Sequence, residues 1–336
     1  MKHFEIFKFV ISFLVVVIST QLLAMDEFEQ RPLIYISLEG GGMHMSPALE
    51  VLAQLESRHQ RPIAELVDGI IGLSSGAIIG AHLLAPNCKY LARELKSELP
   101  CMLKEGAKGS AMNGALTYFF GDKFFNFETL YKRNLGEVCM KDAHGHLLIA
   151  AYNRENNLTK IFDSHEESDA NIGIWNLAQA SGAISNSIGI ELAWGATTIR
   201  CGDQLSPGWV DAGLEPEEQR RPLYESLARK LENSYPYRRI FIFSFGNGST
   251  TFGGNIYKES PITILQVGNI VVSRFIPIYS DIPSSRWGIN NYYQMMFDTS
   301  RENIDIIDSH FFNAELLDHA AYKNLFDVIN KRITYQ

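Results

Sequence analysis

The sequence has few cysteines and no excess of positive charge. Its four cysteines include no CxxC pair, so nothing indicates a zinc ribbon or a redox motif. Thirty basic against 38 acidic residues give a formal net charge of -8, which argues against nucleic acid as a partner and against strong attraction to an anionic membrane. Any membrane contact is therefore expected to be transient, local and hydrophobic.

Long hydrophobic runs are also scarce. The apolar run Phe9–Ile18 follows two lysines, and Ala24 offers a small residue for cleavage. A spanning helix needs about 20 apolar residues, so this shorter run favours a signal peptide over residues 1–24, with an uncleaved anchor as the alternative. Residues 25–32 then form a polar linker, and no later run could span a bilayer. We expect a secreted or periplasmic protein.

Export would allow the cysteines to form disulfides. Cys88 and Cys101 bracket one predicted helix over residues 89–99, which favours their pairing. Free buried thiols are the alternative.

Glycines are concentrated at two turns. An apolar run over residues 33–38 precedes Gly40-Gly41-Gly42, and a second run precedes the G-x-S-x-G turn from Gly72 to Gly76. Neighbouring βα units of a parallel sheet bring such turns together at the carboxyl ends of their strands. Ser74 would then lie on a sharp elbow beside bare backbone N–H groups, as acyl transfer requires. An ordinary βα turn is the alternative for the elbow.

The glycine triplet has a competing interpretation as a dinucleotide-binding loop. Met45 occupies the third glycine position of that motif, which disfavours it. An oxyanion hole makes better use of consecutive glycines, because their N–H groups can approach a developing negative charge. Its predicted members are Gly40, Gly41, Gly42 and Met43. Ser46-Pro47 then predicts a helix start, with Ser46 as the N-cap.

A third motif lies far downstream, where the apolar segment Trp209–Leu214 contains Asp211-Ala212-Gly213. An aspartate before a small residue and a glycine is most often only a turn former. Together with the other two motifs, Asp211 offers a base for Ser74.

The three motifs together resemble the pattern of the patatin-like phospholipases, which is a glycine-rich loop, then G-x-S-x-G, then Asp-Gly-Gly or Asp-Gly-Ala. Similarity extends to an apolar strand over residues 147–153, a small-residue helix over 175–185 and a late strand from Ile240. The resemblance covers roughly residues 33–250. His44 stands where the family usually has Arg or Lys, which makes it a candidate substrate contact.

The resemblance implies a three-layer α/β/α fold with a central, mostly parallel sheet, in one domain over residues 33–336. The motif-bearing part would be 33–250, and the C-terminal part, 251–336, is expected to be helical. The implied function is a serine lipid acyl hydrolase that cleaves fatty-acyl esters of phospholipids or other acyl lipids through a Ser74–Asp211 dyad, without a cofactor or metal.

Two other functions stay open. A Ser-His-Asp α/β-hydrolase could use His310 or His319, but that fold places several strands before its serine. Here only about 40 residues separate the start of the first predicted strand, at Leu33, from Ser74. A weakly active or inactive binding protein with the same fold would explain the altered loop at His44. His144 and His146 have the spacing of two metal ligands on a strand, but no carboxylate pattern accompanies them.

Overall fold

The computed structural model describes residues 31–41, 45–86, 91–102, 105, 127–183, 196–215, 221, 223–236, 238–245, 262–267, 270–275 and 320–334. In these ranges no helix is both long and apolar enough to cross a membrane. The predicted signal peptide lies outside the described residues, and so do Cys88, His310 and His319.

Parallel strands form the centre of a single nine-stranded sheet. They lie in the order β3 (His146–Asn153), β2 (Gly69–Leu73), β1 (Leu33–Leu38), β7 (Ile240–Phe245) and β9 (Ile270–Phe275). The four of these strands that carry a complete burial pattern are buried along almost their whole length, as expected for parallel strands covered on both faces. The two predicted βα units are confirmed as neighbours, since β1 pairs with β2 from Tyr35–Gly69 to Leu38–Gly72.

Antiparallel strands complete both sides of the sheet. On one side β8 (Ile262–Val267) pairs with β9. On the other, β4 (Leu158–Asp163) and β6 (Gln204–Asp211) both pair with β3, and β5 (Thr197–Cys201) pairs with β6.

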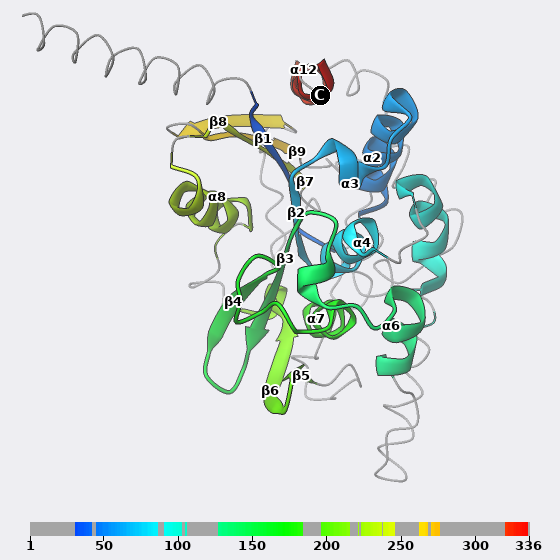
Figure 1. The fold of residues 1–336 in the computed structure, drawn as a ribbon, viewed down its shortest axis with the longest axis vertical. Helices are drawn as coiled ribbons and strands as arrows, with labels where there is room; N and C mark the ends of the chain where they lie inside the picture. Colours follow the sequence, from blue (N-terminus) through cyan, green and yellow to red (C-terminus); the bar gives the residue numbers. More distant parts are fainter. Residues whose placement is uncertain are drawn as a thin grey trace, which may run out of the picture.

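Helices cover both faces of the sheet, which confirms the three-layer α/β/α prediction (Figure 1). Helix α8 (Leu223–Ser234) lies on one face. The other face carries α2 (Ser46–His59), α3 (Ile63–Leu66), α4 (Ser75–Leu84), a helix over 92–102, α6 (Phe127–Leu135) and α7 (Ile174–Ser181). Short 3-10 turns are η2 (Met140–Asp142) and η3 (Ala212–Leu214), and α12 (Ala320–Thr334) is the last described helix.

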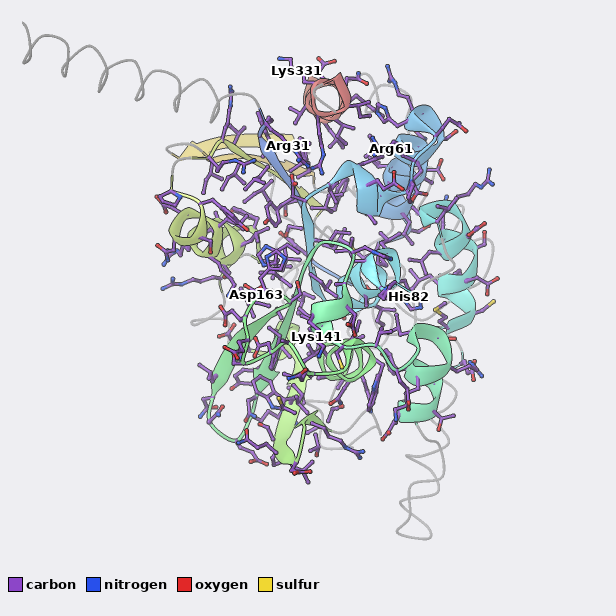
Figure 2. All side chains as sticks on the ribbon, in the orientation of Figure 1. Arg31, Arg61, His82, Lys141, Asp163 and Lys331 are labelled. Carbon is purple, nitrogen blue, oxygen red and sulfur yellow. The ribbon has the colours of Figure 1, made fainter. Side chains whose placement is uncertain are left out.

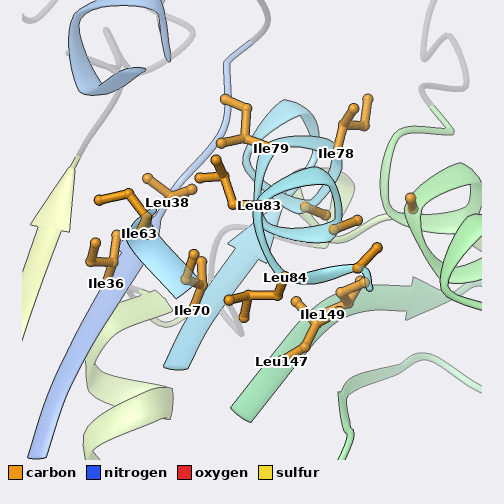
Figure 3. Packing of buried hydrophobic residues seen from close by; sticks show 14 of the residues in the cluster. Ile36, Leu38, Ile63, Ile70, Ile78, Ile79, Leu83, Leu84, Leu147 and Ile149 are labelled. Carbon is orange, nitrogen blue, oxygen red and sulfur yellow. The ribbon is translucent and has the colours of Figure 1, made fainter. Parts of the chain in front are cut away.

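The larger hydrophobic core lies between the sheet and α4 (Figure 3). Alternate strand residues such as Ile36, Ile70 and Ile149 point to this side and belong to the same buried cluster as Ile79 and Leu83 of α4. A Cβ built at Gly80 would lie 3.1 Å from Ile70 Cγ2, so this small residue lets α4 approach the sheet closely. A second core joins the opposite face to α8.

Three sequence predictions were wrong in detail. The C-terminal part is not wholly helical, because β8 and β9 precede α12; their β-branched residues favour strands. Met45 is the N-cap of α2, and Ser46 is the first helical residue. Cys101 has an exposed free thiol, so the predicted disulfide with Cys88 is not formed.

Candidate active site at the carboxyl ends of the strands

Ser74 occupies a strained turn between β2 and α4. Its φ of 56° and ψ of -128° are uncommon for a residue with a side chain. The flanking glycines are required by contact: a Cβ built at Gly72 would lie 2.4 Å from the Gly76 carbonyl oxygen, and one at Gly76 would lie 2.3 Å from the Leu38 carbonyl oxygen. The local geometry is that of a nucleophile elbow.

The glycine-rich loop packs directly on this elbow. Gly40 and Gly41 have φ values of 82° and 112°. A Cβ built at Gly40 would lie 2.8 Å from Ser74 Cβ and 2.3 Å from the Leu73 carbonyl oxygen. The loop backbone at Gly40 thus lies so close to Ser74 that only glycine fits there. The other predicted loop members, Gly42, Met43 and His44, lie outside the described residues.

Strand pairing brings the elbow and the acidic turn to the same place. On β3, Ala150 pairs with Leu73 of β2, and the next residue, Ala151, pairs with Asp211 of β6. Both alanines also pair with β4. A strand has only two edges. Because β4 occupies one of them, β2 and β6 share the other.

Strands β2 and β6 therefore meet end to end. β2 is parallel to β3 and β6 is antiparallel to it, so their carboxyl ends point at each other. The positions facing Leu73 and Asp211 are consecutive residues of β3, about 3.3 Å apart along the strand. The chain leaves the sheet on both sides of this junction, through Ser74 into α4 and through Asp211 into η3.

Asp211 is buried, with 6% of its surface exposed. Its Oδ1 accepts a hydrogen bond of 2.7 Å from the Gly213 N–H, so the aspartate also forms the turn that its sequence context indicated. Ala212 between them is buried as well. Tyr131 of α6 is close enough that burial, together with the negative charge of Asp211, raises the pKa of the tyrosine hydroxyl.

A second polar cluster lies at the opposite, amino end of β3. His146 bonds through Nε2 to Asp163 Oδ1 at 2.7 Å and through Nδ1 to the Tyr35 hydroxyl at 2.8 Å. This partnership could not be predicted from the sequence, because Asp163 reaches His146 only through the β3–β4 pairing. Over the described ranges, no three His, Cys, Asp or Glu side chains are grouped so as to hold a metal ion.

Comparison with solved structures identifies the fold. Human GIVD cytosolic phospholipase A2, solved with methyl gamma-linolenyl fluorophosphonate inhibitor and terbium chloride, superimposes with a TM-score of 0.50 at 12% sequence identity. The match covers 90% of this chain and 60% of that one. This chain has the patatin-like phospholipase fold. No family model matches its sequence.

Two further comparisons, one of sequence and one of structure, also match phospholipase A2-gamma and a bacterial protein complex. Human calcium-independent phospholipase A2-gamma is 33% identical over 79 residues, which is 22% of this chain and 10% of that protein, and the rabbit protein matches equally. The chain thus matches only a small part of these relatives. The ExoU–SpcU complex from Pseudomonas aeruginosa aligns with a TM-score of 0.35 at 12% identity, over 91% of this chain and 60% of that one.

Proposed function

We propose that this chain is a lipid acyl hydrolase that cleaves fatty-acyl esters of phospholipids through a Ser74–Asp211 dyad. One observation carries the proposal: β2 and β6 end against each other on one edge of β3. Ser74, on which Gly40 packs, directly follows one of these strand ends, and the buried Asp211 forms the other. The patatin-like fold and the matches to phospholipases support lipid hydrolysis at the family level.

In this mechanism Ser74 Oγ attacks the ester carbonyl carbon while Asp211 accepts the hydroxyl proton. Backbone N–H groups of the glycine-rich loop stabilise the oxyanion. Collapse breaks the ester C–O bond, and Asp211 returns the proton to the leaving alcohol, which is a lysophospholipid. Water then attacks the acyl-enzyme, Asp211 accepts its proton, and the fatty acid leaves as Ser74 recovers the proton.

Burial helps a carboxylate to act as this base. Asp211 is enclosed by the ends of β3, η3 and α7 rather than by bulk solvent. The proposed mechanism needs this enclosure, because a general base has to meet the serine hydroxyl with bulk water kept away.

We also propose that the protein binds the membrane surface that holds its lipid substrate through the β3–β4 and β5–β6 turns, which lie further along β3 and β6 from Asp211. Leu158 follows the β3–β4 turn and Leu205 follows the β5–β6 turn, and their surfaces are 52% and 66% exposed. Both turns lie at the lower end of Figure 1. The β3–β4 turn continues from the carboxyl end of β3, where Asp211 lies. An apolar side chain on a protruding turn gains free energy by entering the acyl region of a bilayer.

The proposed setting is outside the cytoplasm, after removal of residues 1–24. This rests on the short apolar run and the small residue at Ala24. N-terminal sequencing of exported material that starts at Met1 would contradict it.

The activity is tested with a fluorophosphonate probe and with release of fatty acid from phosphatidylcholine vesicles. The wild type and the exposed control Ser57→Ala should be labelled and active, whereas Ser74→Ala should be neither. Asp211→Asn should be inactive, and Asp203→Asn, on the exposed β5–β6 turn, should behave as wild type.

Two outcomes separate the alternatives. A folded wild type that takes up no probe and releases no fatty acid would be a binding protein. If Asp211→Asn retains activity while His310→Ala or His319→Ala loses it, a serine–histidine mechanism replaces the dyad.

A further inference from the structure

The last turn of α7 packs on the sheet near the point where the ends of β2 and β6 face each other. Ser181 is completely buried there. Its Oγ accepts a hydrogen bond of 2.9 Å from the Ser74 N–H and donates one of 2.7 Å to the Ala150 carbonyl oxygen. One hydroxyl therefore joins the backbone of the elbow to the strand beside it.

The same turn holds the other half of the site. Two residues on, the Ala183 carbonyl oxygen accepts a hydrogen bond of 2.9 Å from the Asp211 N–H. Gly182, between them, leaves no room for a side chain: a Cβ built there would lie 2.8 Å from the Tyr131 hydroxyl and 3.2 Å from the Ala178 carbonyl oxygen. Three consecutive residues thus contact the Ser74 elbow and β3, α6, and β6.

The Ser181 hydroxyl replaces a step of the β-ladder. In a regular parallel pair, a backbone N–H of β2 would donate directly to a carbonyl of β3. Beyond Leu73 the hydroxyl is inserted between the Ser74 N–H and the Ala150 carbonyl, so β2 can diverge from β3 without leaving either group unpaired. The divergence opens the edge of β3 that Asp211 occupies one residue further on.

We propose that Ser181 is a positioning residue that fixes the Ser74 elbow relative to Asp211, an inference that rests on the proposed Ser74–Asp211 mechanism. A hydroxyl fits this role because one atom both donates and accepts. Alanine would leave the Ser74 N–H and the Ala150 carbonyl without this partner, and the strained elbow would relax. Misplacement of a nucleophile by about 1 Å lowers the rate of reaction by about a hundredfold.

A matched control exists at the other end of β3. The Ser164 hydroxyl accepts a hydrogen bond of 2.9 Å from the Leu147 N–H and lies 3.4 Å from the Gly145 carbonyl oxygen, and the residue is likewise buried. It likewise contacts one backbone N–H and one backbone carbonyl, but both belong to the segment at the amino end of β3, away from Ser74.

The test measures the second-order rate of fluorophosphonate labelling, together with kcat and KM on a soluble acyl ester, in Ser181→Ala, Ser181→Thr and Ser164→Ala. We expect labelling and kcat to fall about a hundredfold in Ser181→Ala with KM within about twofold. Ser181→Thr keeps the hydroxyl and should retain rates within about threefold. Ser164→Ala should lose stability comparably but keep its labelling rate.

The outcomes distinguish the two proposals. If the wild type is labelled and Ser181→Ala is labelled equally fast, the positioning role is wrong while the dyad stands. Equal slowing in Ser181→Thr and Ser181→Ala, or in Ser164→Ala, would also overturn the role of the hydroxyl. A folded wild type without labelling overturns the proposed function and this inference together.

Discussion

At their carboxyl ends the parallel strands meet glycines, a strained serine and backbone hydrogen bonds, whereas at their amino ends they meet buried charges. The carboxyl end holds Ser74 at a positive φ. Gly40 and Gly76 lie so close to neighbouring backbone there that neither position has room for a Cβ. The amino end contains ion pairs between side chains of distant elements.

The charges at the amino end attach two helices to the sheet. Asp163, labelled in Figure 2, bonds to His146 of β3 and also forms an ion pair of 2.9 Å with Lys230 of α8. Asp68, next to β2, accepts 2.8 Å and 2.6 Å hydrogen bonds from the Ile34 N–H and from Arg332 of α12. α8 and α12 are thereby fixed to the ends of the strands opposite Ser74.

This difference indicates that the amino ends of the strands stabilise the fold, while the carboxyl ends carry the proposed catalytic groups. A strained elbow persists only where its surroundings over-determine it. Buried ion pairs are strongly destabilising to break, so they suit the end that has only to hold its shape. Substitutions at the two ends should therefore affect different measurements.

The largest expected effect is on activity at the carboxyl end. Ser74→Ala and Asp211→Asn should each lower ester hydrolysis at least about a thousandfold, because each removes a group needed in the transition state. Their free energies of unfolding in urea should stay within about 1 kcal/mol of wild type. A comparable loss of stability in either variant would show that the two ends are not separated as described.

The reverse result is expected at the amino end. Asp163→Asn leaves His146 and Lys230 without their shared carboxylate and should lower the free energy of unfolding by about 3–5 kcal/mol. The folded variant at low temperature should keep wild-type kcat. Glu166→Gln removes only the half-exposed partner of Lys230 and should cost less than about 1 kcal/mol. If Asp163→Asn lost activity but not stability, its cluster would belong to the site.

The pH dependence of stability should come from the same region. Burial lowers the pKa of His82 on α4 to about 4, against 6.5 in an unfolded chain. Below pH 6.5 the unfolded state binds a proton that the native state does not, so stability falls as pH falls. The loss should reach about 3 kcal/mol by pH 4, and His82→Leu should flatten this part of the profile in urea titrations.

Asp163 affects the free energy of unfolding at a lower pH than His82 does. Burial disfavours its ionised form, but hydrogen bonds from His146 and Lys230 outweigh burial and hold the pKa of Asp163 below its usual range. Its contribution is complete above the unfolded pKa of about 3.9 and is lost as pH falls below that value. A His82→Leu profile as steep as wild type between pH 6.5 and 4 would assign the effect to other groups, such as His165, whose ring stacks on that of His146.

The smallest expected effect separates lipid access from chemistry at the carboxyl end. Replacing Leu158 and Leu205 together by serine should lower hydrolysis of phosphatidylcholine vesicles about tenfold, through weaker surface binding, with no change on a soluble ester. Leu91→Ser is the matched control, because Leu91 is exposed at the start of the helix over 92–102. Equal losses on both substrates would place the two leucines in folding rather than in membrane contact.

The sequence was informative where local chemistry decides the structure. Apolar runs predicted β1, β3 and β7, and the glycine spacing predicted the turn at Ser74, because only small residues fit the crowded positions that Gly72 and Gly76 occupy. Small residues likewise marked α7, whose Ala178 and Ala180 are fully buried.

Pairings between distant segments could not be predicted in the same way. The shared edge of β3 depends on β4 occupying the other edge, which no local pattern encodes. The bridging role of Ser181 and the partnership of His146 with Asp163 arise from the same long-range pairing. The expectation of a helical C-terminal part was wrong for a local reason instead, because the β-branched residues of β8 and β9 favour strands.

The meeting of β2 and β6 on one strand also has a consequence for the order of folding. The turn at Ser74 can begin to form when β1, β2 and α4 dock, since these elements are close in the chain, and it gains the Ser181 hydrogen bond once α7 has packed on them. Asp211 arrives only when a much later segment pairs with β3, and such non-local pairings form slowly. A nascent chain would therefore carry a nucleophile without its base, and would be unable to attack acyl esters until the edge of β3 is filled.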